Sequence, residues 1–205
     1  MTQLAGRVLR LGVFGGAFDP PHRMHRVLVE AALDQLQLDR LLVVPTGQAW
    51  HKSRPLSDAA HRLAMAHLAF EDLPALRIDT REIERAGPSY TIDTLRELQD
   101  EFPDATLFLI IGGDQARALS SWHEWQQVVS LATIAVAQRV PAQVTGTRDL
   151  PPADQRQRFV QLQLPACNTS ATDIRQRASR GQSIVPLVSE SVARYIVLHR
   201  LYQTT

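Results

Sequence analysis

Short apolar runs alternate along the chain with segments in which apolar residues recur at helical spacing. The apolar runs predict buried strands, because strands buried on both faces of a parallel sheet read as continuous hydrophobic segments. They cover residues 8–14, 41–45, 76–79, 107–111, 133–137 and 159–164. The periodic segments predict helices over residues 26–38, 58–70, 91–102, 172–180 and 190–198. Ser57 is expected to cap the second helix, and Gly181 to close the fourth.

This alternation predicts an α/β fold, with a doubly wound, mostly parallel sheet covered by helices on both faces. The chain has 205 residues, without internal repeats or a low-complexity linker, so residues 1–205 are expected to form a single domain. The stretch 138–157 is rich in Pro, Gly, Arg and Asp and is expected to be a surface loop.

Composition narrows the class of partner. A net charge of +1 argues against broad attraction to nucleic acid or to a membrane. One cysteine, Cys167, excludes an internal disulfide and a multi-cysteine zinc site. The first ten residues lack the apolar segment of a signal peptide. No run approaches the ~18 apolar residues of a membrane span. We therefore expect a cytoplasmic protein.

The segment with the most candidate binding residues follows the first predicted strand. It contains Gly15, Gly16, Ala17, Phe18 and Asp19, then two histidines where a helix is expected to begin. Small residues let a ligand approach the backbone closely. A helix start offers N–H groups without intrahelical partners and the positive end of the helix dipole. The pattern therefore predicts an anion site.

His22 and His25 are three residues apart and share one face of the first helical turn. They could bind a phosphate chain, or hold a metal with Asp19 as a third ligand, or be an ordinary surface pair. The glycine turn favours phosphate, because it presents backbone donors. Three local pairs of cationic side chains suit a polyphosphate as well: Arg23 with Arg26, Lys52 with Arg54, and Arg175 with Arg177.

A second motif occupies residues 168–175. Ser170 or Thr172 can cap the helix that follows, and Arg175, one turn into it, could fork onto phosphate oxygens. Ligands of doubly wound sheets bind beyond the carboxyl ends of the strands. Asp114, which follows the glycines after the strand 107–111, is therefore expected to contact a ligand hydroxyl or to cap a helix.

Residues 15–25 resemble the GGTFDPxHxGH signature of the HxGH nucleotidylyltransferases, with Ala17 in place of Thr or Ser and Met24 in place of Gly. The motif at 168–175 resembles the SxTxIR element of the same proteins. The segments 45–52, 89–91, 110–114 and 121–122 follow in the order found in bacterial nicotinate-nucleotide adenylyltransferases. Several motifs that occur in the family's order identify the family more specifically than any one of them does alone.

The resemblance implies a Rossmann-like domain that transfers the adenylyl group of ATP to nicotinate mononucleotide, with Mg²⁺ bridging phosphates. It implies charge stabilisation during the reaction by His22, His25, Lys52 and Arg175. The implied ATP contacts are Gly15, Gly16, Ala17, Phe18, Asp19, Met24, Ser170, Thr172 and Asp114. The implied acceptor contacts are Tyr90, Thr91, Trp122 and His123, where His123 replaces the family's usual aromatic residue.

Two alternatives stay open. The chain could be a nucleotide-binding sensor that has lost turnover through Ala17 and Met24, or an adenylyltransferase that prefers nicotinamide mononucleotide. We expect an active enzyme in which Met24 shapes the nucleotide pocket, and we expect Met24→Gly to cost about 1 kcal/mol of stability at most, from helix propensity. A hydride-transferring dehydrogenase is not favoured, because its glycine fingerprint does not occur in this turn.

Overall fold

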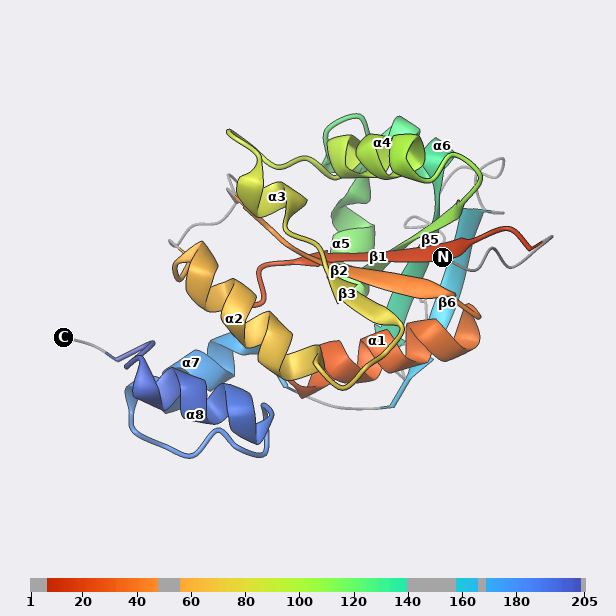
Figure 1. The fold of residues 1–205 in the computed structure, drawn as a ribbon. Helices are drawn as coiled ribbons and strands as arrows, with labels where there is room; N and C mark the ends of the chain where they lie inside the picture. Colours follow the sequence, from red (N-terminus) through yellow and green to blue (C-terminus); the bar gives the residue numbers. More distant parts are fainter. Residues whose placement is uncertain (1–6, 48–55, 140–157, 166–168, 204–205) are drawn as a thin grey trace.

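A computed structural model describes residues 7–47, 56–139, 158–165 and 169–203 (Figure 1). Six strands form one sheet in the order β3-β2-β1-β4-β5-β6, and every neighbouring pair is parallel. The predicted doubly wound sheet is confirmed. Its strands are β1 (Arg10–Gly16), β2 (Arg40–Pro45), β3 (Leu76–Ile78), β4 (Thr106–Gly112), β5 (Ala132–Arg139) and β6 (Phe159–Leu164).

Helices cover both faces of the sheet (Figure 1). One face carries α1 (Arg23–Gln35) and α2 (Ala59–Phe70), and the other carries α4 (Thr91–Glu101) and α6 (Trp125–Leu131). The last helices, α7 (Ala171–Ser179) and α8 (Glu190–Leu198), lie beside α2 rather than on the sheet. None of the helices in the described part of the chain is long and apolar enough to cross a membrane.

Three apolar clusters hold these layers together. Alternate residues of a strand point to opposite faces, so Leu11 and Val13 of β1 pack with the α4 layer, whereas Phe14 packs with α1. The third cluster joins α2 to α7 and α8 and includes Met65, Ile174, Ile184, Val188, Val192, Ala193 and Ile196. The C-terminal helices are therefore anchored through α2.

The strand order places a topological switch between β1 and β4. The chain leaves β1 in one direction to build β2 and β3, then returns to pair β4 with the other side of β1. The connections diverge there, and ligands of such sheets bind beyond the carboxyl ends of the strands at this point. Both glycine turns lie at this edge, because β1 ends at Gly16 and β4 ends at Gly112.

The start of the chain departs from the predicted boundaries. The first strand covers Arg10–Gly16 instead of 8–14, because Gly15 and Gly16 still pair with β2 and Val8 is exposed. Helix α1 covers Arg23–Gln35 instead of 26–38, since His22 already caps it.

Two other caps refine the expectations. The cap of α2 is Asp58, whose side chain accepts the Ala60 N–H, and not Ser57. Helix α7 begins at Ala171 with Ser170 as its cap, and Gly181 takes the expected left-handed conformation with φ +67°.

Short elements escaped prediction. Helices α3 (Arg81–Glu84), α5 (Gly113–Ala118) and α6, with the 3₁₀ turn η1 (Leu119–Ser121), are too short to show a clear helical period. The cap of α5 is Gly112, so the helix-cap alternative for Asp114 is wrong. Residues 138 and 139 extend β5, and the rest of the predicted loop lies outside the described residues, as does Cys167.

Met24 lies in the first turn of α1, and its side chain is only 7% exposed. It belongs to the apolar cluster between α1 and the sheet, together with Phe14, Phe18 and Leu28. A buried core side chain contributes far more to the free energy of unfolding than the difference in helix propensity does. The expectation that Met24→Gly would cost about 1 kcal/mol at most is therefore wrong.

We expect Met24→Gly to lower the free energy of unfolding by about 2–5 kcal/mol, because loss of a buried methionine side chain leaves a cavity. The control Met24→Leu conserves volume and should cost less than about 1.5 kcal/mol. Urea denaturation measures both values. Equal, small costs for the two variants would show that Met24 does not support the core.

Candidate active site

Phe18 anchors the turn that joins β1 to α1 to the hydrophobic core. Its ring is 1% exposed and meets Phe14, Phe70 and His25 edge-on, with centroids 5.4, 6.3 and 5.1 Å away. Phe18 has a left-handed φ of 48° and is followed by the cis peptide Asp19–Pro20. Because the Phe18 ring is buried in the core, only the backbone of Phe18 can contact a ligand.

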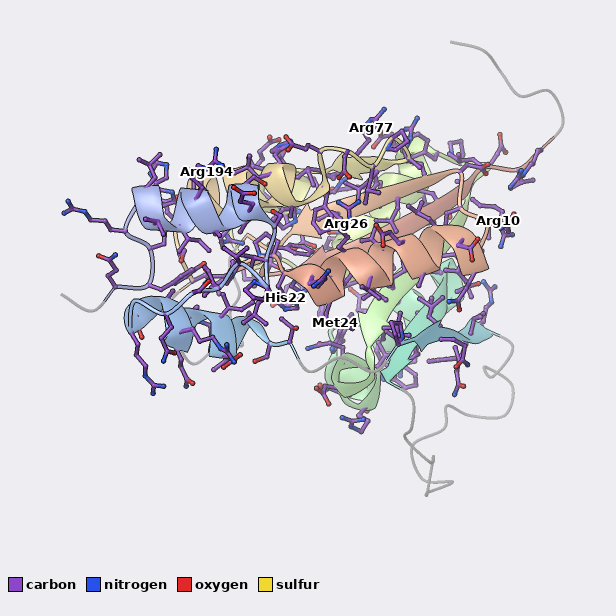
Figure 2. All side chains as sticks on the ribbon, turned by 90° about the horizontal axis from the view of Figure 1, so that it is seen from below. Arg10, His22, Met24, Arg26, Arg77 and Arg194 are labelled. Carbon is purple, nitrogen blue, oxygen red and sulfur yellow. The ribbon has the colours of Figure 1, made fainter. Side chains whose placement is uncertain are left out.

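His22 caps the start of α1 on the side of α7 and α8 (Figure 2), and His25 lies in the first turn of the helix. Their rings stack with centroids 3.7 Å apart and an interplanar angle of 15°. The backbone N–H of His22 donates to Nδ1 of His25 at 3.1 Å. Nδ1 is therefore the acceptor nitrogen, which leaves the proton of the neutral ring on Nε2. His25 presents an N–H donor at its far edge.

The carboxylate of Asp19 accepts hydrogen bonds from two other elements. Asp19 is 2% exposed, and its Oδ1 accepts the Tyr202 O–H at 2.7 Å while its Oδ2 accepts the Ser57 N–H at 3.2 Å. Among the residues that the structure describes, no group of three His, Cys, Asp or Glu side chains could hold a metal ion. The geometry does not favour a His–His–Asp metal site.

The second motif meets the first across the fold. Arg175 donates from Nη1 to the backbone carbonyl of Asp19 at 2.8 Å and from Nη2 to Thr172 Oγ1 at 3.0 Å. Ser170 accepts the Asp173 N–H at 3.1 Å and so caps α7. Arg177 points elsewhere and pairs with Asp173. Arg175 therefore joins the first turn of α7 to the turn before α1.

The glycines at the ends of the two central strands leave room at this edge. A Cβ at Gly15 or Gly112 would meet no protein atom within 4 Å. Asp114, just beyond Gly112, is exposed and forms an ion pair with Arg117. An open edge flanked by both motifs can accept the backbone and sugar of a nucleotide.

The four predicted acceptor contacts come from two neighbouring segments on the α4 face. Tyr90 caps α4, and Thr91 begins it. Trp122 follows the turn η1 and packs half-buried in the α4–α6 cluster. The rings of Tyr90 and His123 lie 4.5 Å apart, and His123 Nε2 is 3.2 Å from Glu124 Oε1. The structure thus brings Tyr90 and His123 into contact.

Gly47 fixes the approach to this segment. A Cβ at Gly47 would lie 1.9 Å from the backbone carbonyl oxygen of Glu82 and 3.0 Å from Ser89 Oγ. Only glycine allows this contact between the turn after β2 and the segment that leads to Tyr90. Lys52, further along the same loop, lies outside the described residues, so its role stays a prediction.

Two residues that were not predicted from the sequence, Arg62 and Tyr202, contact the turn between β1 and α1 (residues 17–22, called the signature turn below). Arg62 is 2% exposed and donates to Ala17 O at 3.1 Å and to Ser57 O at 3.0 Å. Burial lowers the pKa of Arg62, while the nearby carboxylates of Asp19 and Asp58 oppose that shift.

A signal for Arg62 exists in the sequence. It shares one face of α2 with Met65, Ala66 and Ala69, and an arginine on an apolar face needs buried acceptors. Tyr202 offers no comparable signal, since its partner Asp19 is 183 residues away.

Comparison with known proteins agrees with this geometry. The cytidylyltransferase-like family model matches residues 13–177. A "Probable nicotinate-nucleotide adenylyltransferase" of Albidiferax ferrireducens is 57% identical over 95% of this chain and 98% of its own length. One of the same name from Methylibium petroleiphilum is 44% identical over 94% and 92%. The chain therefore belongs to the nicotinate-nucleotide adenylyltransferase family, within the cytidylyltransferase-like proteins.

Solved structures share the fold. The nicotinic acid mononucleotide adenylyltransferase of Plasmodium falciparum, complexed with NaAD, has a TM-score of 0.78 over 95% of this chain and 97% of its own. Its sequence is only 17% identical, so this likeness concerns the fold alone.

We expect Arg175→Lys to weaken ATP binding by about tenfold, because an ammonium cannot reproduce a planar guanidinium that forks between oxygens. Arg177→Lys is the matched control on the same helix, and it should leave the affinity within about twofold, as expected of an exposed ion pair. Isothermal titration with ATP measures both. Equal, small effects of the two substitutions would show that Arg175 does not bind the phosphates of ATP.

Proposed function

We propose that the chain transfers the adenylyl group of ATP to nicotinate mononucleotide, giving deamido-NAD and pyrophosphate. The observation that carries this proposal is the contact of Arg175 with the carbonyl of Asp19, which unites two motifs 156 residues apart into one phosphate site. The names of the relatives supply the acceptor. The cytoplasmic location expected from the sequence stays part of the proposal, because ATP is supplied there.

The reaction needs alignment more than it needs a protein base. The acceptor phosphate is already largely dianionic at pH 7, because its second pKa is near ~6. It can attack the α-phosphorus of ATP directly and expel pyrophosphate, without a covalent enzyme intermediate. The protein must hold two anions in line and neutralise the charge that develops on the leaving group.

The described residues suit that work. His25 would donate from Nε2 to a phosphate oxygen, since Nδ1 is occupied by the His22 N–H. Arg175 and the starts of α1 and α7 would surround the phosphate chain, with Lys52 as a further predicted cation. No protein cage of three ligands occurs among the described residues, which fits a Mg²⁺ ion carried by the phosphates of ATP. That ion would supply charge neutralisation.

The acceptor pocket is proposed at Tyr90, Thr91, Trp122 and His123. Trp122 would stack on the pyridine ring, and N–H groups at the start of α4 and in the turn after Trp122 would bind the ring carboxylate. The burial of Met24 also weakens the sensor alternative, because its side chain lies in the core instead of across the site.

We expect nicotinate mononucleotide to be the better acceptor. Donors that bind the carboxylate lose partners when the amide is bound, at a cost of about 1–3 kcal/mol. The ratio of kcat/KM for the acid over the amide should therefore be about 5-fold to 150-fold. Pyrophosphate release with ATP and each acceptor measures the ratio. Equal values would contradict the assigned pocket, and no release with either acceptor would support the sensor alternative.

We expect His25→Asn to lower kcat by about 10²-fold or more, as loss of a donor to developing charge does. The asparagine Oδ1 can still accept the His22 N–H, so the helix start is retained while the far donor is removed. The control His67→Asn changes an exposed histidine of α2 and should leave kcat unchanged. A His25→Asn enzyme with normal kcat would exclude the assigned role.

A further inference from the structure

The signature turn is held from behind by the C-terminal segment of the chain. Tyr202 donates its O–H to Oδ1 of Asp19 at 2.7 Å, and the Ser57 N–H occupies Oδ2 at 3.2 Å. The carboxylate is 2% exposed. A buried carboxylate is costly unless its oxygens accept hydrogen bonds. The Tyr202 hydroxyl is thus one of the groups that keep Asp19 where it is.

The position of Asp19 matters because its own backbone faces the phosphate site. The carbonyl of Asp19 accepts from Arg175, and that of Ala17, two residues earlier, accepts from Arg62. The side chain of Asp19 and its carbonyl are therefore fixed from different elements. Asp19 therefore links Tyr202, through its carboxylate, to Arg175, through its carbonyl, and a shift of the whole residue changes both contacts.

The hydrogen bond between Tyr202 and Asp19 does not depend on pH within the assay range. Burial and the Asp19 carboxylate both raise the pKa of Tyr202 above its ordinary value. The phenol therefore keeps its proton throughout the assay range and donates to a charged acceptor, which is a strong type of hydrogen bond. Tyr202 itself has a left-handed φ of 67° at the end of the unit formed by α7 and α8.

We propose that Tyr202 is a positioning residue for the ATP subsite, and that it acts through Asp19. The inference rests on the proposed function only in naming ATP as the ligand. Tyr202 touches neither substrate in this scheme. It sets the geometry of the turn between β1 and α1, and with it the direction of the Arg175 guanidinium.

The test compares two phenol deletions in the same C-terminal unit. Tyr202→Phe removes the O–H that reaches Asp19, together with the hydrogen bond between the phenol oxygen and the Ser57 side chain. The matched control Tyr195→Phe removes an O–H that bonds His61 Nδ1 at 3.0 Å, away from the signature turn. We expect Tyr202→Phe to weaken ATP binding and to lower kcat/KM for ATP by about tenfold, while KM for nicotinate mononucleotide stays within about twofold. Tyr195→Phe should leave all three values unchanged.

Binding is measured by titration calorimetry with ATP alone, so the outcome does not depend on turnover. If the natural chain binds ATP but shows no transfer to nicotinate mononucleotide, the proposed function fails and the Tyr202 test still stands. Natural ATP affinity in Tyr202→Phe would overturn the inference. Equal losses in both variants would overturn it as well, because a general effect on the C-terminal unit would then explain them.

A double-mutant cycle separates positioning from fold stability. Asp19→Ala removes both carboxylate oxygens, so the contact with Tyr202 is absent in this variant. If Tyr202 acts through Asp19, adding Tyr202→Phe to Asp19→Ala should cause less than about twofold further loss of ATP affinity. Additive losses would show that Tyr202 acts elsewhere. Thermal unfolding of each variant confirms that the folded protein is being compared.

Discussion

The parallel pairing of β1 with β2 on one side and β4 on the other is the constraint on which the site depends. It buries the central strand between two apolar layers and aligns the ends of β1 and β4 at the same edge. Each strand ends in glycine, so the edge stays open where the two connections diverge. The direction of β1 carries the chain to that edge, and the turn after β1 then places the helix start with His22 and His25.

The parts of the fold that rest on long, regular patterns could be predicted from the sequence. The run 107–111 lies within β4, and the helix 190–198 matches α8 residue for residue. Strand ends were harder. Glycines read as a turn, yet Gly15 and Gly16 still pair with β2, because a parallel ladder needs only backbone groups. Elements shorter than two turns, such as α5, leave too few positions to show a period.

The site was predictable only where chemistry is concentrated in a local motif. His22, His25, Ser170 and Arg175 are predicted because each lies near a helix start with a characteristic spacing, and the structure brings Arg175 to the turn that precedes His22. Arg62 and Tyr202 stabilise the same turn through contacts made at a distance in sequence, and nothing adjacent to them announces their partners. The motif that predicts a ligand contact at Met24 gives no sign that its side chain fills the core, so a contact with ATP there is left to its backbone and stays a prediction.

The contact between Gly47 and the carbonyl of Glu82 links two loops mechanically. One loop continues β2 toward the predicted cation Lys52, and the other leads to Tyr90. With no side chain between them, they meet backbone against backbone, and a displacement of either must be carried by the other. In the proposed acceptor pocket, a side chain at position 47 would therefore act on Tyr90 indirectly, by displacing the backbone at Glu82 and the segment that leads to Tyr90.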